Sequence, residues 1–264
     1  MQKETVQKHL SNLSPISLTG LDTVKLLNRV DRKYIIPVTS LSQIIQLLKN
    51  NQYSVLEING CRAFSYLTTY YDNDAYAFFH DHHNRLSNRI KVRTRSYLES
   101  NLHFFEVKVK TKLRTNKYRE VLHASSTQLS DAQSNKIREF YPRQLTGRLD
   151  TTLINTYNRI TLVNKDKTER CTIDVNLTFT NPASLHEEIC VNDIAIIEVK
   201  QSKTSVLNGI IAALRTMRIP PSSISKYVLG LILTRPEIKH NAFKPLLHKI
   251  NKIKYILRLT KIFN

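Results

Sequence analysis

The sequence predicts a mixed α+β fold in which an antiparallel β-barrel forms a tunnel and helices pack outside it. Three observations point there. Strand-like segments recur along the chain, most of them alternate basic with apolar side chains, and amphipathic helical segments fall between them. Apolar residues make up 41% of the 264 residues, which is enough for a substantial core.

Strands are predicted from runs of β-branched and aromatic residues with a period of two. The run "RVDRKYIIP" at 29–37 comes first, and "AFSYLTTYYDN" at 63–73 follows it. Further strands are expected at 88–97, 103–112, 117–122, 153–163, 168–179 and 192–200.

Helices are predicted where apolar residues recur at helical spacing. Near 40–49, one face carries Leu41, Ile44, Ile45 and Leu48, and Ser40 with Gln43 has the spacing of a capping box. Other helices are expected at 128–143, in "SKYVLGLIL", and near 204–217, where Val206, Leu207, Ile210, Ile211 and Leu214 share a face after a Thr204 or Ser205 cap.

The chain reads as one main domain, because no low-complexity linker divides it. We expect a helical lead-in at 1–27, a tunnel domain at 28–236 and a basic amphipathic tail at 237–264. The start "MQKETVQKHL" has no apolar signal-peptide core, and no run approaches about 18 apolar residues. The expectation is a cytoplasmic, soluble protein.

The net charge and the missing motifs limit the classes of function. Lysine and arginine number 40 against 21 acidic residues, a formal charge of +19, which implies a polyanionic partner. No GxxxxGK or GxGxxG occurs, so phosphate would be held by side chains. The cysteines Cys61, Cys171 and Cys190 form no CxxC pair, which argues against a disulfide framework or a structural zinc site.

The basic residues alternate along the strands. In 88–97, Arg89, Lys91, Arg93 and Arg95 share one face while Ile90 and Val92 share the other. An ordinary antiparallel sheet with one solvated face alternates in the same way. At least six strands share the pattern, however, and like charges opposed across a ladder repel. Closing the sheet would turn the basic face inward and make a tunnel lined by cations, in which an anion could sit.

Single carboxylates occur among the basic residues on these strand faces. Asp31, Glu106, Asp174 and Glu198 each lie two residues from a lysine or arginine on the same face. Each could be an ion-pair partner. As a group they could instead hold Mg²⁺ or Mn²⁺, which take oxygen ligands and bridge phosphates. A cationic tunnel with a divalent metal suits phosphoryl transfer.

Eight motifs in order carry a resemblance to a known family: "RVDRKY", "IKVRTRSY", "FFEVKVK", "NKYRE", "YNR", "CTID", "IIEVKQ" and "SKYVLG". The set, which spans roughly 29 to 230, resembles the polyphosphate polymerase domain of the vacuolar transporter chaperone (VTC) complex in its stand-alone bacterial form. That domain belongs to the triphosphate tunnel metalloenzymes. The resemblance implies a tunnel that transfers the γ-phosphate of ATP to polyphosphate with Mn²⁺ or Mg²⁺.

The resemblance also implies roles for residues. It implies that the catalytic residues are Arg93, Arg95, Lys108 and Arg159. It implies that substrate is bound by Lys33, Lys117, Tyr157, Arg170, Ser225 and Lys226. The metal would be bound by Glu198, with Glu106 as the second candidate. Two positions depart from the family pattern: Asp31 stands where Glu is common, and Ser223 stands where yeast-type members carry Lys.

Alternatives remain open at this level. A tunnel of the same kind could hydrolyse tripolyphosphate or a nucleoside triphosphate, or bind polyphosphate or nucleic acid without catalysis. Nucleic acid is not expected, because no stacking platform of the RRM type appears. The run "HDHH" at 80–83 is expected to be a polar loop or helix end and not a metal site, since its histidines are too close together in the chain.

The tail interleaves apolar and basic residues. Its Leu246, Leu247, Ile250, Ile253 and Leu257 fall at helical spacing among lysines and an arginine. Such a helix could cover the apolar exterior of the barrel, or contact an anionic membrane surface or a membrane-protein partner.

Overall fold

The computed structural model describes residues 10–22, 24, 29–112, 114–184, 187–202 and 209–262. The strands are β1 (Ser14–Ile16), β2 (Arg29–Pro37), β3 (Tyr53–Leu56), β4 (Phe64–Asn73), β5 (Arg89–Tyr97), β6 (Leu102–Lys110), β7 (Thr115–Leu122), β8 (Leu149–Asn164), β9 (Glu169–Thr180), β10 (Glu188–Val191) and β11 (Ile194–Ser202). The helices are α2 (Leu18–Asp22), α3 (Leu41–Asn50), α4 (Ala77–His83), α5 (Asp131–Phe140), α6 (Gly209–Thr216), α7 (Lys226–Thr234) and α8 (Lys244–Ile262), with short 3-10 turns η1 (Val38–Ser40) and η2 (Asn241–Phe243).

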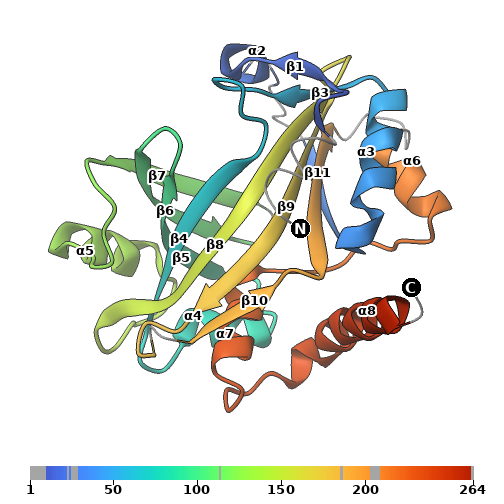
Figure 1. The fold of residues 1–264 in the computed structure, drawn as a ribbon. Coiled ribbons are helices and arrows are strands. Elements are labelled where there is room, and N and C mark those ends of the chain that lie inside the picture. Colours follow the sequence, from blue (N-terminus) through green and yellow to red (C-terminus); the bar gives the residue numbers. More distant parts are fainter. Residues whose placement is uncertain are drawn as a thin grey trace.

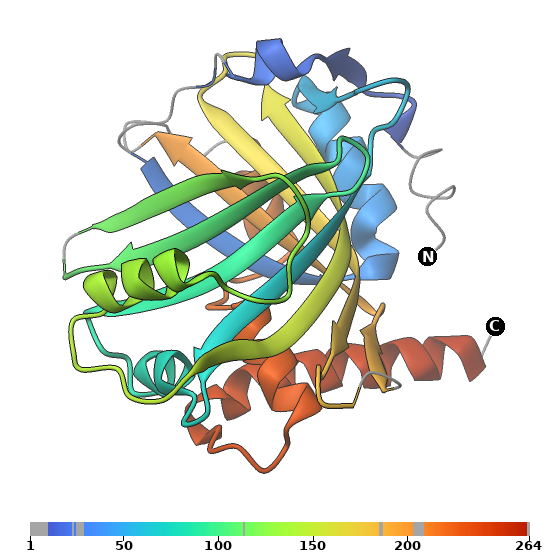
Figure 2. The ribbon, with the colours of Figure 1, turned by 90° about the vertical axis from the view of Figure 1, so that its left-hand side faces the viewer.

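The described strands form one 11-stranded sheet in the order β2-β11-β9-β8-β4-β5-β6-β7, with β1, β3 and β10 attached beside this path. All neighbours along the path are antiparallel. The sheet curls, so that β5, β6 and β7 face β9, β11 and β2 (Figures 1 and 2). This confirms the predicted mixed fold with an antiparallel tunnel, although the edge strands β2 and β7 are not hydrogen-bonded to each other in the described part of the chain.

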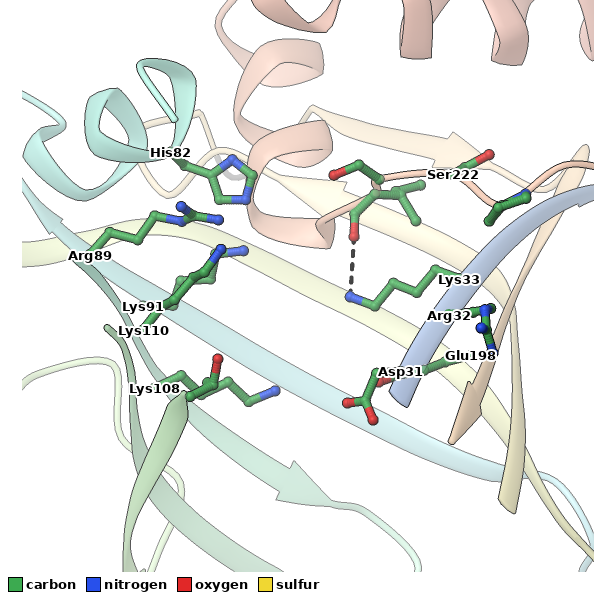
Figure 3. A pocket seen from close by; sticks show the side chains of 14 residues that line it. Asp31, Arg32, Lys33, His82, Arg89, Lys91, Lys108, Lys110, Glu198 and Ser222 are labelled. Atoms are coloured by element: carbon green, nitrogen blue, oxygen red, sulfur yellow. Dashed lines mark hydrogen bonds between the residues drawn. The ribbon is translucent and has the colours of Figure 1, made fainter. Parts of the chain in front are cut away.

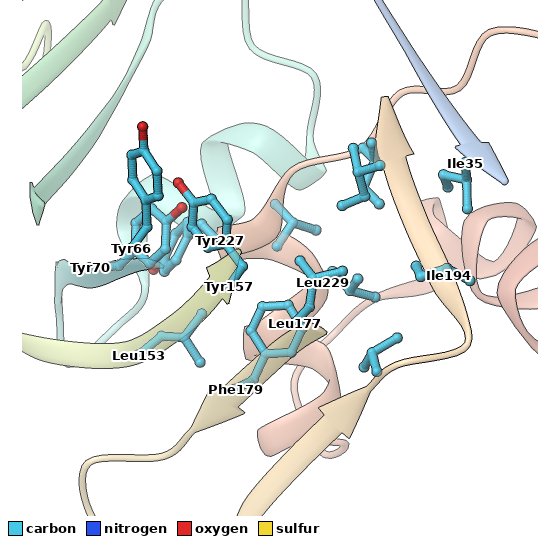
Figure 4. Close-up of a cluster of buried hydrophobic side chains, with 14 of the residues drawn as sticks. Ile35, Tyr66, Tyr70, Leu153, Tyr157, Leu177, Phe179, Ile194, Tyr227 and Leu229 are labelled. Carbon is cyan, nitrogen blue, oxygen red and sulfur yellow. The ribbon is translucent and has the colours of Figure 1, made fainter. Parts of the chain in front are cut away.

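Helices cover the outer, apolar face of the curled sheet. Residues such as Ile90 and Val92 of β5 turn outward and pack in one cluster with Ile137 of α5. A second cluster joins α3 and α6 to β2, β9 and β11. These two clusters leave the basic faces of the strands to the inside. The largest cluster lies on that inner face, under α7 and the first half of α8 (Figure 4). Its Ile35 and Ile196 lie two residues from Lys33 and Glu198, and its Tyr70 also lines the cavity.

Most predicted helices are confirmed, but one predicted cap is wrong. Leu41, Ile44, Ile45 and Leu48 of α3 are buried as expected, yet Ser40 makes no side-chain capping bond. Its backbone is already helical because η1 runs directly into α3, whereas a capping residue needs an extended backbone. The capping box stands instead at α5, where Ser130 Oγ accepts from the Gln133 amide at 3.2 Å.

Two predicted segments, the 1–27 lead-in and the helix near 204–217, fall partly outside the described residues. In the 1–27 lead-in, β1 pairs in parallel with β3 before the short helix α2. The predicted cap at Thr204 or Ser205, with Val206 and Leu207, lies outside the described residues; Ile210, Ile211 and Leu214 are buried on α6 as expected. No helix among the described residues is long and apolar enough to cross a membrane.

The C-terminal tail forms the long helix α8. Ile250 and Ile253 are buried in the largest cluster, so α8 packs with α7 against the inner-face residues of that cluster and not against the sheet exterior. Tyr255, Ile256 and Leu259 remain exposed on the other side. Contact of that side with a membrane or a partner stays a prediction.

Two interactions fix helix α7 against the sheet. The Tyr227 hydroxyl donates to the buried Asp72 carboxylate at 2.6 Å, and the same carboxylate accepts from the first amides of α4, those of Phe78 and Phe79, at 3.0 Å. One turn on, Gly230 leaves room for Phe179 and Leu153 to approach the helix. These contacts position the start of α7, which reaches the interior of the sheet.

We expect Gly230→Ala to lower the free energy of unfolding by about 1–3 kcal/mol, the usual penalty for overpacking. A Cβ here would lie 2.5 Å from Leu153 Cδ2 and as close to the Phe179 ring, which Figure 4 shows beside α7. Denaturant unfolding measures the change. Asn135→Ala, on the exposed side of α5, is the control and should stay within about 0.5 kcal/mol of the parent. Equal stability of Gly230→Ala and the parent would contradict this account of the helix–sheet contact.

Candidate phosphate-binding tunnel

The inside of the curled sheet is a cavity in two connected chambers. The inner chamber, of about 490 Å³, and the middle chamber, of about 600 Å³, share Asp31, Lys33, Lys91, Lys108, Thr115 and Glu198 as lining residues. The inner chamber is also lined by Arg29, Tyr70, Arg93, Arg95, Tyr97, Lys117, Arg119, Arg159, Arg170, Thr172, Lys200, Ser225 and Lys226. Among these described residues the only carboxylates are Asp31 and Glu198, so the cavity is strongly cationic.

The register of β5, β6 and β7 arranges the cations in rows across the strands. Lys91 pairs with Lys108, which pairs with Lys117, so three lysines lie side by side on the inner face. The next row in one direction is Arg93–Glu106–Arg119, in which a carboxylate separates two cations. Residues two apart on a strand are about 7 Å apart, so the rows repeat at that interval.

The surroundings of the lysine row disfavour the charged forms of Lys108 and Lys91. The charge of Arg93, together with burial, lowers the pKa of Lys108 to about 6. Burial and the charges of Lys33 and Arg89 lower the pKa of Lys91 well below its ordinary value. Like charges this close repel, and a bound polyanion would relieve the repulsion.

Glu106, in contrast, neutralises the cations that surround it in the cavity wall. Its side chain is fully buried, and its two oxygens contact Arg93 at 2.6 Å, Lys117 at 2.5 Å and Arg119 at 3.1 Å. Burial alone would raise its pKa, but the charges of Arg93, Arg95 and Lys117 hold the pKa well below the ordinary range. Both oxygens are thus engaged by cations, and the predicted metal role of Glu106 stays a prediction that this geometry does not favour.

A second balanced group lies where β8, β9 and α7 meet. Arg159 donates two hydrogen bonds to Asp174, at 2.6 and 2.8 Å, and Lys226 of α7 donates to the same carboxylate. Burial would raise the pKa of Asp174, but Arg159 and Lys226 hold it well below its ordinary range. Asp174 therefore orients two lining cations and is an ion-pair partner, one of the two roles its sequence position allowed.

Aromatic rings pack against several of the lining cations. Tyr66 and Tyr157 stack with ring centroids 5.1 Å apart, and the guanidinium groups of Arg95 and Arg159 lie 5.2–5.9 Å from these rings. The Lys226 ammonium lies 4.2 Å from the Tyr157 ring centre. Tyr157 is buried, and the cavity lining does not include it; it supports the lining from below, and Figure 4 shows it among Tyr66, Tyr70 and Tyr227.

Glu198 differs from the other two interior carboxylates in its surroundings. Among the described contacts its only ion pair is with Lys200, at 3.7 Å. Burial would raise the pKa of Glu198, but the nearby charges of Lys200, Lys33 and Arg159 lower it, so the group is ionised. Directly across the ladder, the buried hydroxyl of Thr172 has no hydrogen-bond partner. An ionised carboxylate beside a free oxygen fits a divalent cation that takes its remaining ligands from phosphates and water.

The structure therefore brings the predicted site residues together. Ten of them line the inner chamber: Lys33, Arg93, Arg95, Lys108, Lys117, Arg159, Arg170, Glu198, Ser225 and Lys226. Tyr157 and Glu106 lie directly behind that lining. Their roles in binding and catalysis remain predictions.

Sequence reasoning did not assign roles to Lys91, Arg119 or Lys200, which also line the chamber. All three continue a period-two basic stripe, and that pattern alone could have selected them. Lys91 donates to Ser225 Oγ at 3.1 Å, and Lys33 donates to the Ile224 carbonyl at 3.2 Å (Figure 3). These two bonds tie the segment before α7 to facing walls, which no sequence pattern indicates.

The histidine run lies at the end of α4, as expected from sequence. No group of three or more histidine, cysteine, aspartate or glutamate side chains in the described part of the chain is arranged to hold a metal ion. A metal at Glu198 would need ligands from a bound substrate.

The comparisons with known proteins bear on this geometry. The VTC domain family matches residues 28–234, while no curated protein matches the chain. Among solved structures, a candidate adenylate cyclase from Vibrio parahaemolyticus is 12% identical, with 78% of this chain and 99% of that chain covered and a TM-score of 0.45.

Two further structures are similar at the same low level. A candidate adenylyl cyclase from Hippeastrum, described as having a dominant triphosphatase activity, is 12% identical over 81% of this chain and all of that one (100%), with a TM-score of 0.46. The RNA triphosphatase Pct1 from S. pombe is 10% identical over 97% and 91%, with a TM-score of 0.30. Likeness this low says nothing of what this chain does.

We expect binding of inorganic tripolyphosphate to take up protons. Lys108, with a pKa of about 6, is largely neutral above that pH in the free protein, and a bound polyanion raises the pKa. Affinity from this group should therefore fall as pH rises above about 6. Calorimetry in two buffers of different ionisation enthalpy measures the uptake.

The matched variant is Lys108→Arg, whose side chain stays charged at every pH. Ligand binding to this variant should take up fewer protons than binding to the parent, by at most one proton per ligand. Lys165→Arg, on an exposed turn, should behave as the parent. Undiminished uptake in Lys108→Arg would contradict the assignment.

Glu106→Gln should destabilise the free protein by about 2–3 kcal/mol. This is less than for a fully buried pair, because Lys117 and Arg119 are more than a third exposed. Since the folded-state pKa of Glu106 is lowered, the loss should be complete above the ordinary pKa of 4.5 and shrink as pH falls below it. Thermal or denaturant unfolding at pH 7 and at pH 3 checks both. A loss that did not depend on pH would contradict the charge-based explanation.

Proposed function

Because the chain belongs to the VTC domain family, we propose that it is a metal-dependent polyphosphate polymerase, which transfers the γ-phosphate of ATP to a growing polyphosphate chain inside the cationic cavity. The family match covers 28–234, which contains every residue that lines the inner chamber. ATP and polyphosphate are both linear polyanions, and the excess of positive charge in the cavity suits both.

The observation that carries the proposal is the length of the cationic lining. The inner and middle chambers form one continuous cavity, and rows of cations continue through both of them. A hydrolase acting on one triphosphate needs cations only around that triphosphate. A polymerase also needs a place for the acceptor chain, and the second chamber would offer one.

Mn²⁺ or Mg²⁺ would be held by Glu198, with the Thr172 hydroxyl nearby and with phosphate oxygens completing the shell. When bound, such an ion neutralises phosphate charge and orients the triphosphate. Asp31 lies in the same two chambers but pairs with Arg29 at 3.1 Å, which makes Glu198 the better candidate.

The chain's own residues would do the rest by positioning and charge. Arg93, Lys108 and Arg159 would bind the oxygens of the reacting γ-phosphate, where negative charge is redistributed in the transition state. An oxygen of the terminal phosphate of the bound chain attacks the γ-phosphorus in line. The bond from that phosphorus to the β–γ bridging oxygen breaks, and ADP leaves. No side chain acts as a nucleophile.

Substrate binding would fall to the remaining cations and to the start of α7. Lys33, Lys117, Arg170 and Lys226 come from four different elements and surround the inner chamber. Lys226 is held by Asp174, and Lys91 fixes Ser225, so this part of the wall is ordered before substrate arrives. Such preorganisation lowers the reorganisation needed at the moment of reaction.

The test is incubation of the purified protein with ATP and Mn²⁺ or Mg²⁺, with products resolved on a gel that separates phosphate chains. We expect a metal-dependent ladder. Glu198→Gln and Arg93→Ala should each reduce its rate of formation by about a hundredfold or more, the usual effect of losing one electrostatic donor. Lys165→Ala removes one exposed charge and should have no effect.

Other outcomes would redirect the proposal. Free phosphate without a ladder would make the protein a tunnel hydrolase. Tight polyphosphate binding without turnover of ATP would make it a binding module. Either result would overturn polymerase activity while leaving the cavity as the binding site.

A further inference from the structure

A third hollow adjoins the middle chamber and opens to the surface. This outer groove, of about 600 Å³, lies between the end of α4, the segment 220–223 and the start of α8. It shares His82, Arg89, Lys110, Pro221, Ser222 and Ser223 with the middle chamber. Inner chamber, middle chamber and outer groove therefore follow one another as a single path.

The outer groove is cationic, with more basic than acidic groups at its wall. Its basic side chains are Arg85, Arg89, Lys110 and Lys249, and no carboxylate occurs among the described residues that line it. None of the four forms an ion pair with a described carboxylate. The acidic group of α4, Asp81, forms its ion pair with Arg143, and its charge also acts on Arg89.

The groove continues the rows of the tunnel wall. After Arg93–Glu106–Arg119 and Lys91–Lys108–Lys117, the next row toward the groove is Arg89–Lys110–Thr115. Each row lies about 7 Å from the last. A linear anion bound along the rows would reach Arg89 and Lys110 after passing the lysine row.

His82 lies at the join between the middle chamber and the groove and lines both. Its Nδ1 is buried and has no hydrogen-bond partner, and Figure 3 shows the ring beside Arg89 at the cavity wall. Burial, with the charges of Lys91 and Arg89, lowers the pKa of His82 to about 3, so the ring is neutral. Its neighbour His83 is fully occupied, with one ring nitrogen bonded to Asn84 and the other to Asn241.

Lys249 joins α8 to the same path. Its ammonium donates to Ser222 Oγ at 2.6 Å, and the Ser222 amide donates to the Lys33 carbonyl at 2.7 Å. The long C-terminal helix thus places a cation on the groove and is tied through one residue to the edge strand β2. This is a role for α8 besides covering the sheet.

We propose that the outer groove binds the polyphosphate chain where it leaves the cavity, so that product emerges between α4 and α8 and not past Tyr97 and Arg119 of the inner chamber. The inference rests on the proposed function for the identity of the chain. Its residues are Arg85, Arg89, Lys110 and Lys249 as cations and His82 as a neutral partner.

The groove suits bare phosphate chains better than nucleic acid. It is continuous with a cavity lined by strand rows, and Phe243, the aromatic residue of its lining other than the two histidines, packs against Phe79 and His83. No free ring among the described lining residues is thus available for base stacking, which single-stranded nucleic acids use.

The experiment measures binding of long linear polyphosphate and of tripolyphosphate, without ATP, to the full chain. Arg85→Gln/Lys249→Gln removes two groove cations. Lys252→Gln/Arg258→Gln makes the same charge change on the exposed side of α8 and is the matched control. We expect the groove variant to bind long polyphosphate about tenfold more weakly or worse, with tripolyphosphate affinity unchanged. The control should match the parent for both ligands.

The outcomes separate this inference from the proposed function. If the groove variant binds long chains as tightly as the control does, the groove assignment is wrong, whether or not the parent makes polymer. If the parent makes no polymer but its preference for long chains depends on Arg85 and Lys249, the groove stands and the polymerase proposal fails. An oligonucleotide of similar charge that bound the groove as tightly as polyphosphate would overturn the assignment to a phosphate chain.

Discussion

Mutual repulsion of lysines and arginines inside a curled sheet is the constraint on which the rest of this structure depends. The row Lys91–Lys108–Lys117 sets three basic side chains next to one another; burial lowers the pKa of Lys91, whereas the Lys117 side chain is 39% exposed. Such an arrangement is unfavourable unless the groups lose protons or an anion is present. The charge of Arg93 and burial lower the pKa of Lys108 to about 6, so loss of its proton would relieve part of the repulsion above that pH.

Two buried carboxylates make the fold compatible with that interior. Glu106 engages the cations of β5 and β7, and Asp174 engages those of β8 and α7. Removing either would leave buried charge unbalanced. Glu198 lies near the charges of Lys200, Lys33 and Arg159, but its one described ion pair, with Lys200 at 3.7 Å, is long, which leaves its oxygens available to a ligand. Interior carboxylates thus either neutralise neighbouring cations or remain available to a ligand, and the number of cations in contact with each carboxylate distinguishes the two roles.

Much of this arrangement follows from local pattern. The period-two stripes in "IKVRTRSY" and "FFEVKVK" predict both the strands and which side chains turn inward, because alternation is a property of a single strand. The helical spacing in "LSQIIQLLKN" likewise predicts the buried face of α3. The predicted capping box at Ser40 is wrong, because the preceding turn already holds the Ser40 backbone in a helical conformation. That conformation depends on how η1 meets α3.

The sequence by itself determined the strand faces, the excess of positive charge and ten of the residues that line the inner chamber. Only the tertiary structure decided the rows, since which cation faces which depends on register between strands and a slip of one residue would turn each side chain to the other face. It also decided that α7 enters the cavity, and that Lys249 reaches a groove next to β5. These contacts join residues far apart in the chain, and no local pattern encodes them.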